Sequence, residues 1–220
     1  MKISFIINIL LSIMTVNAII MCIIGFKFMY GYEPYPELIG VPIFSYYTVQ
    51  SNVFMGIVSF VFAIREYQIL RGIKKEIPLA HYIFKMVATV AVSLTFFVVF
   101  AIFGFMSRGG HISLLRNSYL FFHLVIPVVS ILNYVIFEKT NIIKLKHVFY
   151  GLLPTILYEI YYTINLLLNM QNGKVSMRND WYSFAQNGLL KTVLVAPAMI
   201  GITFCLSWII WKLNKKKRFI

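Results

Sequence analysis

The chain is poor in charged residues, and acidic residues are especially scarce. Only 7 of its 220 residues are Asp or Glu, and charged residues of both signs make up 12% of the sequence, against about 25% in soluble domains. Hydrophobic residues make up 60% of the chain, and its mean hydropathy is +0.81. This composition excludes an ordinary soluble domain and predicts an integral membrane protein.

Cysteine and histidine are also few, and neither forms a ligand motif. The two cysteines lie in apolar runs without Cys-x-x-Cys spacing, which excludes a disulfide framework and a thiolate metal site. No two histidines stand four residues apart, the spacing that places two ligands on one helical face. The residues concerned are Cys22, Cys205, His81, His111, His123 and His147. We expect neither a metal nor another cofactor.

Long apolar runs dominate the rest of the sequence. A membrane-spanning helix needs about 20 mostly apolar residues, and six segments meet this length. The first continues well past a signal-peptide length, so we interpret it as a span. The sequence predicts an all-α membrane protein, with residues 1–220 forming one domain of six helices at about 3–27, 44–64, 82–105, 118–137, 147–168 and 188–211.

The basic residues are unevenly divided between the two sides that six crossings define. Fourteen of the 20 Lys and Arg residues fall at the termini or in the 65–85 and 138–146 loops. Because cytoplasmic loops are enriched in Lys and Arg, both termini should be cytoplasmic, in the plasma membrane if the source is bacterial. The terminal "KKKR" suits anionic lipid headgroups. The net charge of +13 therefore gives no reason to expect a nucleic-acid partner.

The second predicted span begins with an unusually polar stretch, "FSYYTVQSNVF" at residues 44–54. Thr48, Ser51 and Asn52 stand at i, i+3 and i+4 and so share one helical face, whereas Gln50 points elsewhere. These side chains can hydrogen-bond to carbonyls one turn earlier or join two helices. Alternatively, the face belongs to a functional site.

The fourth span, "NSYLFFHLVIPVVSILNYVIF", carries a histidine close to its outer end. At 1.5 Å per residue His123 lies roughly 8 Å deep, and Thr48 lies roughly 6 Å deep on its own helix. Pro127 cannot donate to the carbonyl of His123, so the helix should open there. His123 is either a hydrogen-bond partner for another helix or a general base for the Thr48 hydroxyl.

The fifth span and the loop after it add further polar and aromatic residues. Glu159 in "LYEIYYTIN" lies near the bilayer centre, where a carboxylate is either neutral and hydrogen-bonded or orients a partner such as a histidine. Nearby tyrosines, Tyr162 among them, suggest that this helix faces a cavity. In the outer loop Trp181 and Tyr182 form either an interfacial belt or a lid over a pocket, with Asp180 as its polar tip.

Three blocks together, "FSYYTVQSNVF", "NSYLFFHLVIP" and "DWYSF", resemble the signatures of a six-transmembrane family. This is the family of the androgen-induced and androgen-dependent TFPI-regulating proteins, which has many bacterial members. Its animal members hydrolyse fatty acid esters of hydroxy fatty acids with a membrane-embedded threonine and histidine. The resemblance covers essentially all six spans and implies that Thr48 and His123 are the catalytic pair.

The resulting hypothesis is an intramembrane threonine hydrolase of lipid esters. His123 takes the proton from Thr48, the threonine attacks the acyl carbonyl, and water releases the acyl group. Ser51 and Asn52 are candidate donors to the oxyanion, and Glu159 or Asp180 is a candidate third group. The expected partners are membrane lipids and a lipid ester that enters from the outer leaflet. The alternatives are a small transporter or channel and a regulatory membrane protein.

Overall fold

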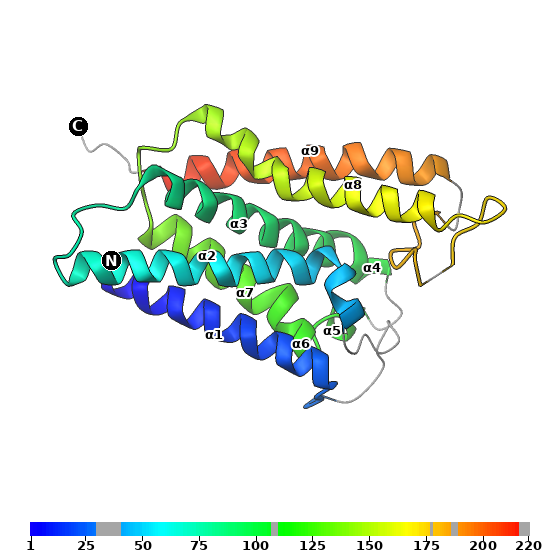
Figure 1. Cartoon of the computed structure of the whole chain (residues 1–220), viewed down its shortest axis with the longest axis horizontal. Coiled ribbons are helices and arrows are strands. Elements are labelled where there is room, and N and C mark those ends of the chain that lie inside the picture. Colours follow the sequence, from blue (N-terminus) through cyan, green and yellow to red (C-terminus); the bar gives the residue numbers. More distant parts are fainter. Residues whose placement is uncertain (30–40, 107–109, 177, 186–188, 216–220) are drawn as a thin grey trace.

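The computed structural model describes residues 1–29, 41–106, 110–176, 178–185 and 189–215, and in this part of the chain the structure is helical without strands. Six helical runs are long and apolar enough to cross a membrane, which confirms the predicted all-α, six-span fold. The helices α1 to α3 and α7 to α9 form an elongated bundle (Figure 1). The runs are Lys2–Ile24, Tyr47–Leu70, Leu79–Phe103, Ser118–Phe137, Leu145–Leu168 and Leu194–Asn214.

Several runs combine two or more kinds of helix. The first half of the chain contains α1 (Lys2–Ile24), η1 (Val41–Ser45), α2 (Tyr47–Leu70), α3 (Leu79–Val98), η2 (Val99–Phe103), α4 (Gly104–Met106) and α5 (Gly110–Ser113). The second half contains α6 (Ser118–Leu120), η3 (Phe121–Val125), α7 (Ile126–Leu132), η4 (Asn133–Phe137), η5 (Leu145–Leu152), α8 (Leu153–Leu168) and α9 (Leu189–Asn214). The segments η2, η3 and η4 are single π-helical turns within otherwise α-helical runs.

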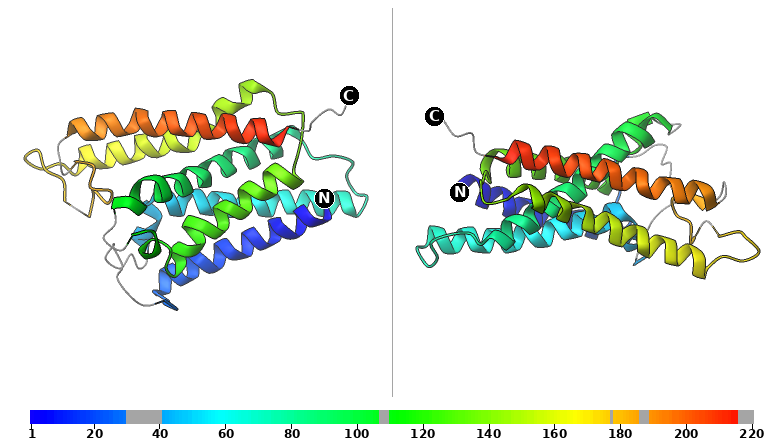
Figure 2. Two further views of the ribbon diagram at one scale, coloured as in Figure 1. Left: turned by 180° about the vertical axis from the view of Figure 1, so that it is seen from behind. Right: turned by 90° about the horizontal axis from the view of Figure 1, so that it is seen from above.

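The helix α3 is the centre of the bundle. Its span is 61% buried, against 17% for the last span, and it packs against α2, α7, α9 and η5. Small residues such as Ala88 and Ala91, which are fully buried, allow neighbouring helices to approach closely. Two views agree that α8 and α9 run side by side on one flank, and that α1 packs beside α2 on the other (Figure 2).

The start of α1 and the end of α9 lie at the same end of the bundle, which we call the termini end. The Ser4 hydroxyl donates to the Glu138 carboxylate at 3.2 Å, and the Asn214 side-chain amide donates to the Glu138 backbone carbonyl at 3.0 Å. Both ends of the chain therefore meet the segment that follows η4. This arrangement agrees with an even number of crossings, and it leaves open which side of the membrane the termini occupy.

Two helices extend further towards the termini end than the sequence pattern predicted. Arg65 and Glu66 lie within α2, and Lys85 lies within α3. The assignment of Arg65 and Glu66 to a loop was wrong, because charged residues can end an apolar run without ending the helix. Lys85, where the predicted 65–85 loop and the 82–105 span overlap, belongs to the helix. The basic residues at 216–218, Arg108 and the loop residues 30–40 lie outside the described residues.

Candidate functional site

A pocket of about 100 Å³ lies at the end of the bundle opposite the termini end. It is enclosed by the first turn of α2, the end of α3, the π-helical turn η3, α8 and the segment 178–185. Most of its lining is aliphatic or aromatic, as in a site for an apolar ligand. Apart from tyrosines, its polar lining residues are Thr48, Thr95, His123, Thr155 and Glu159.

Thr48 occupies the second position of α2, where the helix begins. Neither its hydroxyl nor its backbone N–H has a hydrogen-bond partner within the described chain. An N–H in the first turn of a helix has no acceptor inside that helix, and the helix dipole makes this end favourable for negative charge. Thr48 thus combines an unengaged hydroxyl with an adjacent unengaged donor, both at a pocket wall.

The turn η3 positions His123. The N–H of Ile126 donates to the carbonyl of Phe121, five residues back, which makes the turn π-helical. The next donor in this pattern would be residue 127, but a proline has no N–H, so the Phe122 carbonyl remains open. The Asn52 side-chain amide donates to it at 3.1 Å. The helix departs from α-helical geometry around the histidine, but the carbonyl left open is that of Phe122 and not the predicted carbonyl of His123. Such π-bulges are frequent at functional sites.

The imidazole of His123 is buried and held in a defined orientation. Its Nδ1–H donates to the Leu114 carbonyl at 2.7 Å, and its ring stacks on Tyr119 with the centroids 5.3 Å apart and the planes at 13°. Because Nδ1 bears the proton, the neutral ring has its lone pair on Nε2. This nitrogen has no hydrogen-bond partner within the described chain, so it is available to accept a proton.

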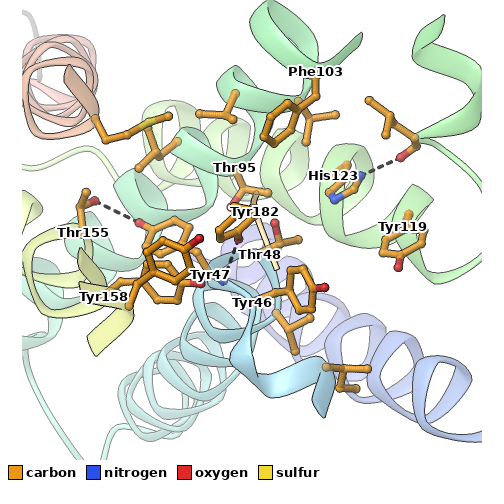
Figure 3. A pocket seen from close by; sticks show the side chains of 18 of the residues that line it. Tyr46, Tyr47, Thr48, Thr95, Phe103, Tyr119, His123, Thr155, Tyr158 and Tyr182 are labelled. Atoms are coloured by element: carbon orange, nitrogen blue, oxygen red, sulfur yellow. Dashed lines mark hydrogen bonds between the residues drawn. The ribbon is translucent and has the colours of Figure 1, made fainter. Parts of the chain in front are cut away.

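Thr48 and His123 face the same pocket space (Figure 3). The ring nitrogen that does not bond Leu114 points towards the side of the pocket on which Thr48 lies. No hydrogen bond joins the Thr48 hydroxyl to the ring in the described structure. The structure therefore brings the two predicted residues into one pocket without a hydrogen bond between them.

Ser51 and Asn52 do not serve as the predicted oxyanion donors. The Ser51 hydroxyl donates to the Thr48 backbone carbonyl at 3.0 Å and also meets the Thr95 hydroxyl at 3.1 Å. The Asn52 amide donates to the same Thr48 carbonyl at 2.7 Å as well as to Phe122. Both side chains thus bond to carbonyls one turn earlier or join helices, which is the structural alternative. Asn52 nevertheless links the backbone of Thr48 to the residue before His123.

Neither predicted candidate for the third group orients His123. Glu159 lines the pocket from α8 but forms no hydrogen bond within the described chain. Asp180 is completely buried rather than a polar tip. Its carboxylate accepts from the Tyr162 hydroxyl and from the backbone N–H groups of Phe184 and Ala185, the latter two at 3.1 Å. Asp180 organises segment 178–185, and the Leu114 carbonyl orients His123 instead.

The aromatic residues of segment 178–185 form part of the pocket wall. Tyr182 and Phe184 line the pocket, and the Tyr182 hydroxyl accepts from the Tyr47 N–H at 3.1 Å. Trp181 donates from its indole nitrogen to the Tyr158 hydroxyl at 2.8 Å. Of the two interpretations of these residues, the one that places them over a pocket fits the described contacts.

A second, larger hollow of about 560 Å³ lies beside the pocket, between α2, α3, η5 and α8. The two hollows share Tyr47 and Tyr158 as lining residues. The second is lined mainly by apolar side chains, and Phe84 and Leu157 on its rim are 57% and 64% exposed. It therefore forms an apolar groove on the bundle surface next to the pocket.

Reasoning from the sequence missed two features that matter here. The Leu114 carbonyl was not predictable, because every residue carries a carbonyl and only the fold selects one. A second polar centre at the termini end, built around Glu66, Lys85 and Glu138, did leave a signal. These are ionisable residues at the margins of apolar runs, and the predicted loop boundaries excluded them.

The fold and the pocket define a six-span helical membrane protein with a threonine and a histidine at a shared apolar pocket. Comparisons of the chain with protein-family models, with curated proteins and with solved structures return no match.

Proposed function

We propose that this protein is an intramembrane hydrolase of lipid esters, with Thr48 as nucleophile and His123 as general base. One observation carries the proposal: an unengaged hydroxyl and the unengaged Nε2 of a buried, oriented imidazole face one apolar pocket in a membrane-spanning bundle. A nucleophile beside a base that is itself oriented by a third group is the usual pattern of covalent ester hydrolysis.

The reaction proceeds in two halves. His123 Nε2 takes the proton as the Thr48 oxygen attacks the ester carbonyl, and the imidazolium then protonates the departing alcohol oxygen as the ester C–O bond breaks. Water, deprotonated by the same nitrogen, attacks the acyl-threonine. The bond between the acyl carbon and the Thr48 oxygen then breaks, the imidazolium returns the proton to that oxygen, and the carboxylic acid is released. The absence of a hydrogen bond between the two side chains in the described structure is compatible with a base that completes this bond only when substrate is bound.

The backbone supplies the oxyanion donor in this proposal. The N–H of Thr48 is unengaged and belongs to the first turn of α2, so it combines a hydrogen bond with the positive end of the helix dipole. One such donor typically lowers the barrier by about 3 kcal/mol. Ser51 and Asn52 contribute indirectly. Both donate hydrogen bonds to the Thr48 carbonyl and so fix the start of α2.

The surroundings favour a lipid substrate that moves in sideways from the bilayer. The apolar groove that shares Tyr47 and Tyr158 with the pocket suits an acyl chain whose ester group reaches Thr48. The three sequence blocks support membership in the six-transmembrane family described above. Fatty acid esters of hydroxy fatty acids, or similar acyl esters, are the proposed substrates, and the outer leaflet is the proposed side of entry.

Ester turnover by purified protein tests the catalytic pair. Thr48→Ala removes the nucleophile and His123→Ala removes the base, so each should lower kcat for a fluorogenic medium-chain ester by at least about 100-fold. A fluorophosphonate probe should label the wild-type protein and fail to label Thr48→Ala.

Two matched substitutions control for general damage. Thr163→Ala changes an exposed threonine of α8, and His81→Ala changes a histidine at the termini end of α3. Both should retain turnover. Wild-type rates in both Thr48→Ala and His123→Ala, or a probe that still labels Thr48→Ala, would refute the proposal.

A further inference from the structure

A cluster of buried ionisable residues lies at the termini end, far along the helices from the pocket. Glu66 of α2 is 2% exposed, Lys85 of α3 is fully buried, and Glu138, which follows η4, is 4% exposed. The Lys85 Nζ lies 3.8 Å from Glu138 Oε1. Ionisable residues enclosed by a membrane bundle are costly and usually have a function, and the proposed hydrolase does not use these.

Asn8 of α1 connects the three ionisable residues. Its Oδ1 accepts from Lys85, and its Nδ2 donates to Glu66 Oε2 at 3.0 Å and to Glu138 Oε1 at 2.8 Å. Lys85 also donates to the Ser59 hydroxyl at 2.8 Å. The ammonium group is thus well supplied with acceptors, and one amide joins the first three helices to the end of η4.

The two oxygens of Glu138 differ sharply in their surroundings. Oε1 accepts from Ser4 at 3.2 Å, from Asn8 at 2.8 Å and from Asn133 Nδ2 at 2.7 Å. Oε2 is buried and has no partner in the described structure, and the same holds for Asn133 Oδ1 and the Tyr134 hydroxyl. Asn133 and Glu138 lie one π-helical turn apart, and the Glu138 N–H donates to the Asn133 carbonyl at 3.1 Å. The Asn133 amide therefore packs against the carboxylate.

The cluster contains an unbalanced negative charge and acceptor atoms without partners, and one added group can correct both. Two carboxylates and one ammonium leave one negative charge unbalanced, which is expensive to bury. Glu138 Oε2 and Asn133 Oδ1 are both acceptors without partners, so neither can satisfy the other without an added donor or cation. A water molecule supplies donors but no charge. We propose that the cluster is a binding site for one monovalent cation, either a proton or an alkali metal ion, at Glu138 Oε2, Asn133 Oδ1 and the Tyr134 hydroxyl.

The side chains that the neighbouring helices add around the site do not change the count of two carboxylates and one ammonium. From α3, Tyr82 packs beside Tyr134 in the same buried cluster, and a phenol is neutral near pH 7. From α9, the Asn214 amide donates to the backbone carbonyls of Tyr134 and Glu138 at 2.6 and 3.0 Å. The helix α1 contributes only Ser4 and Asn8, which are uncharged, and α2 contributes Glu66. Lys85 is the one cationic side chain hydrogen-bonded into the cluster among the described residues.

Occupation of the site would neutralise the network that contains Glu138, and the hydrogen bonds of that network join α1, α2, α3 and the end of η4. A cation that binds the folded protein and not the unfolded chain stabilises the fold by mass action. Above about pH 6 the carboxylates of an unfolded chain are ionised, so a proton retained there is specific to the folded state. Stability should then fall as the pH rises and the proton is lost.

Thermal unfolding of the purified protein in detergent tests the site and its ligand. Melting temperatures are measured from pH 6 to 9 in choline chloride, and then at one pH with NaCl or KCl replacing choline at equal ionic strength. If the ligand is a proton, the melting temperature should fall by about 2–4 °C per pH unit while the folded protein retains a proton that the unfolded chain has lost, and it should level off once the folded protein loses that proton. If it is an alkali ion, the melting temperature should rise with NaCl or KCl.

Glu138→Gln should abolish whichever dependence is found. Its amide oxygen can keep the three donors of Oε1, while its NH₂ group donates to Asn133 Oδ1 without a net charge. Glu66→Gln removes the unbalanced negative charge at the other carboxylate. It should therefore also reduce the dependence of the melting temperature on pH or on the alkali salt. Glu76→Gln, in the exposed loop between α2 and α3, is the matched control and should behave like the wild type.

Infrared spectroscopy gives a measurement that does not require a stable Glu138 variant. Wild-type protein with a bound proton should show a protonated-carboxyl band near neutral pH that Glu66→Gln removes. A wild-type melting temperature independent of pH, Na⁺ and K⁺ would overturn the proposal. So would a dependence that Glu138→Gln or Glu66→Gln retains in full. These results do not depend on ester hydrolysis, so the two proposals can fail separately.

Discussion

His123 receives its orientation from a backbone carbonyl rather than from a carboxylate. The Leu114 carbonyl fixes the tautomer as effectively as an acid would, but it is neutral and gives less support to an imidazolium. The burial of the ring, at 6% exposure, works in the same direction and favours the neutral base. In the proposed mechanism, His123 would therefore accept a proton briefly rather than hold it.

Asn52 is the residue whose replacement should test this positioning. Asn52→Ala leaves the buried Phe122 carbonyl without a donor, which should destabilise the protein by about 1–3 kcal/mol. It should also lower kcat for ester hydrolysis more than it changes KM, because the turn bearing His123 loses its link to Thr48.

Gln50→Ala is the matched control for Asn52→Ala, since it removes an exposed amide of the same helix that bonds only the Phe44 carbonyl. Thermal unfolding and steady-state kinetics of the two variants give the comparison. Equal behaviour of both would contradict the positioning role of Asn52.

At the scale of elements, π-helical turns occur where the two polar centres are built. The turn η3 carries His123, and η4 stacks Asn133 against Glu138. A π-turn inserts one residue into an α-helix and shifts the faces of everything that follows. It thereby directs a polar side chain inwards at that point of the helix.

The packing of η5 against α9 yields a prediction at this scale. A methyl group added at Gly151 would collide with Ser207, which is fully buried and donates to the Val148 carbonyl at 2.7 Å. Gly151→Ala should therefore destabilise the protein by about 1–3 kcal/mol.

Gly201, on α9 itself, has nothing within 4 Å of such a methyl group. Gly201→Ala should be neutral or stabilise the helix by up to about 1 kcal/mol. Melting temperatures in detergent distinguish the two glycines, and a larger loss at Gly201 than at Gly151 would contradict the described packing.

At the scale of the whole molecule, the two polar centres occupy opposite ends of the bundle and share helices. The helix α2 carries Thr48 at its start and Glu66 near its end, and α3 carries Lys85 near its start and Thr95 near its end. The proposed lipid chemistry and the proposed cation site are therefore joined by the most buried helix of the fold.

The orientation of the bundle remains a prediction from the distribution of basic residues. Most of them still fall at the termini end once Lys85 is assigned to α3, so that end should be cytoplasmic. A cysteine introduced at Glu76 should be protected from a membrane-impermeant maleimide in intact cells. One introduced at Asn172, beyond α8, should react. The reverse pattern would place the termini outside.

The sequence indicated several residues of the candidate pocket, and the role assignments that the contacts do not support share one cause. Thr48 and His123 were selected by depth along two helices, and the opening at Pro127 follows from local chemistry. Ser51, Asn52, Glu159 and Asp180 were given roles that the described contacts do not support. Ser51, Asn52 and Asp180 instead bond to backbone groups or to other elements, and Glu159 forms no hydrogen bond within the described chain.

The sequence by itself determined the class of this protein and its spans, because the bilayer imposes a local rule. A backbone in hydrocarbon must satisfy its own hydrogen bonds, so length and apolarity identify each helix. Only the tertiary structure decided which polar groups meet. Asn52 donates a hydrogen bond to Phe122, 70 residues away in the sequence, and Ser4 donates one to Glu138, 134 residues away. Such contacts depend on how helices pack side by side, and a pattern read along one helix does not contain that information.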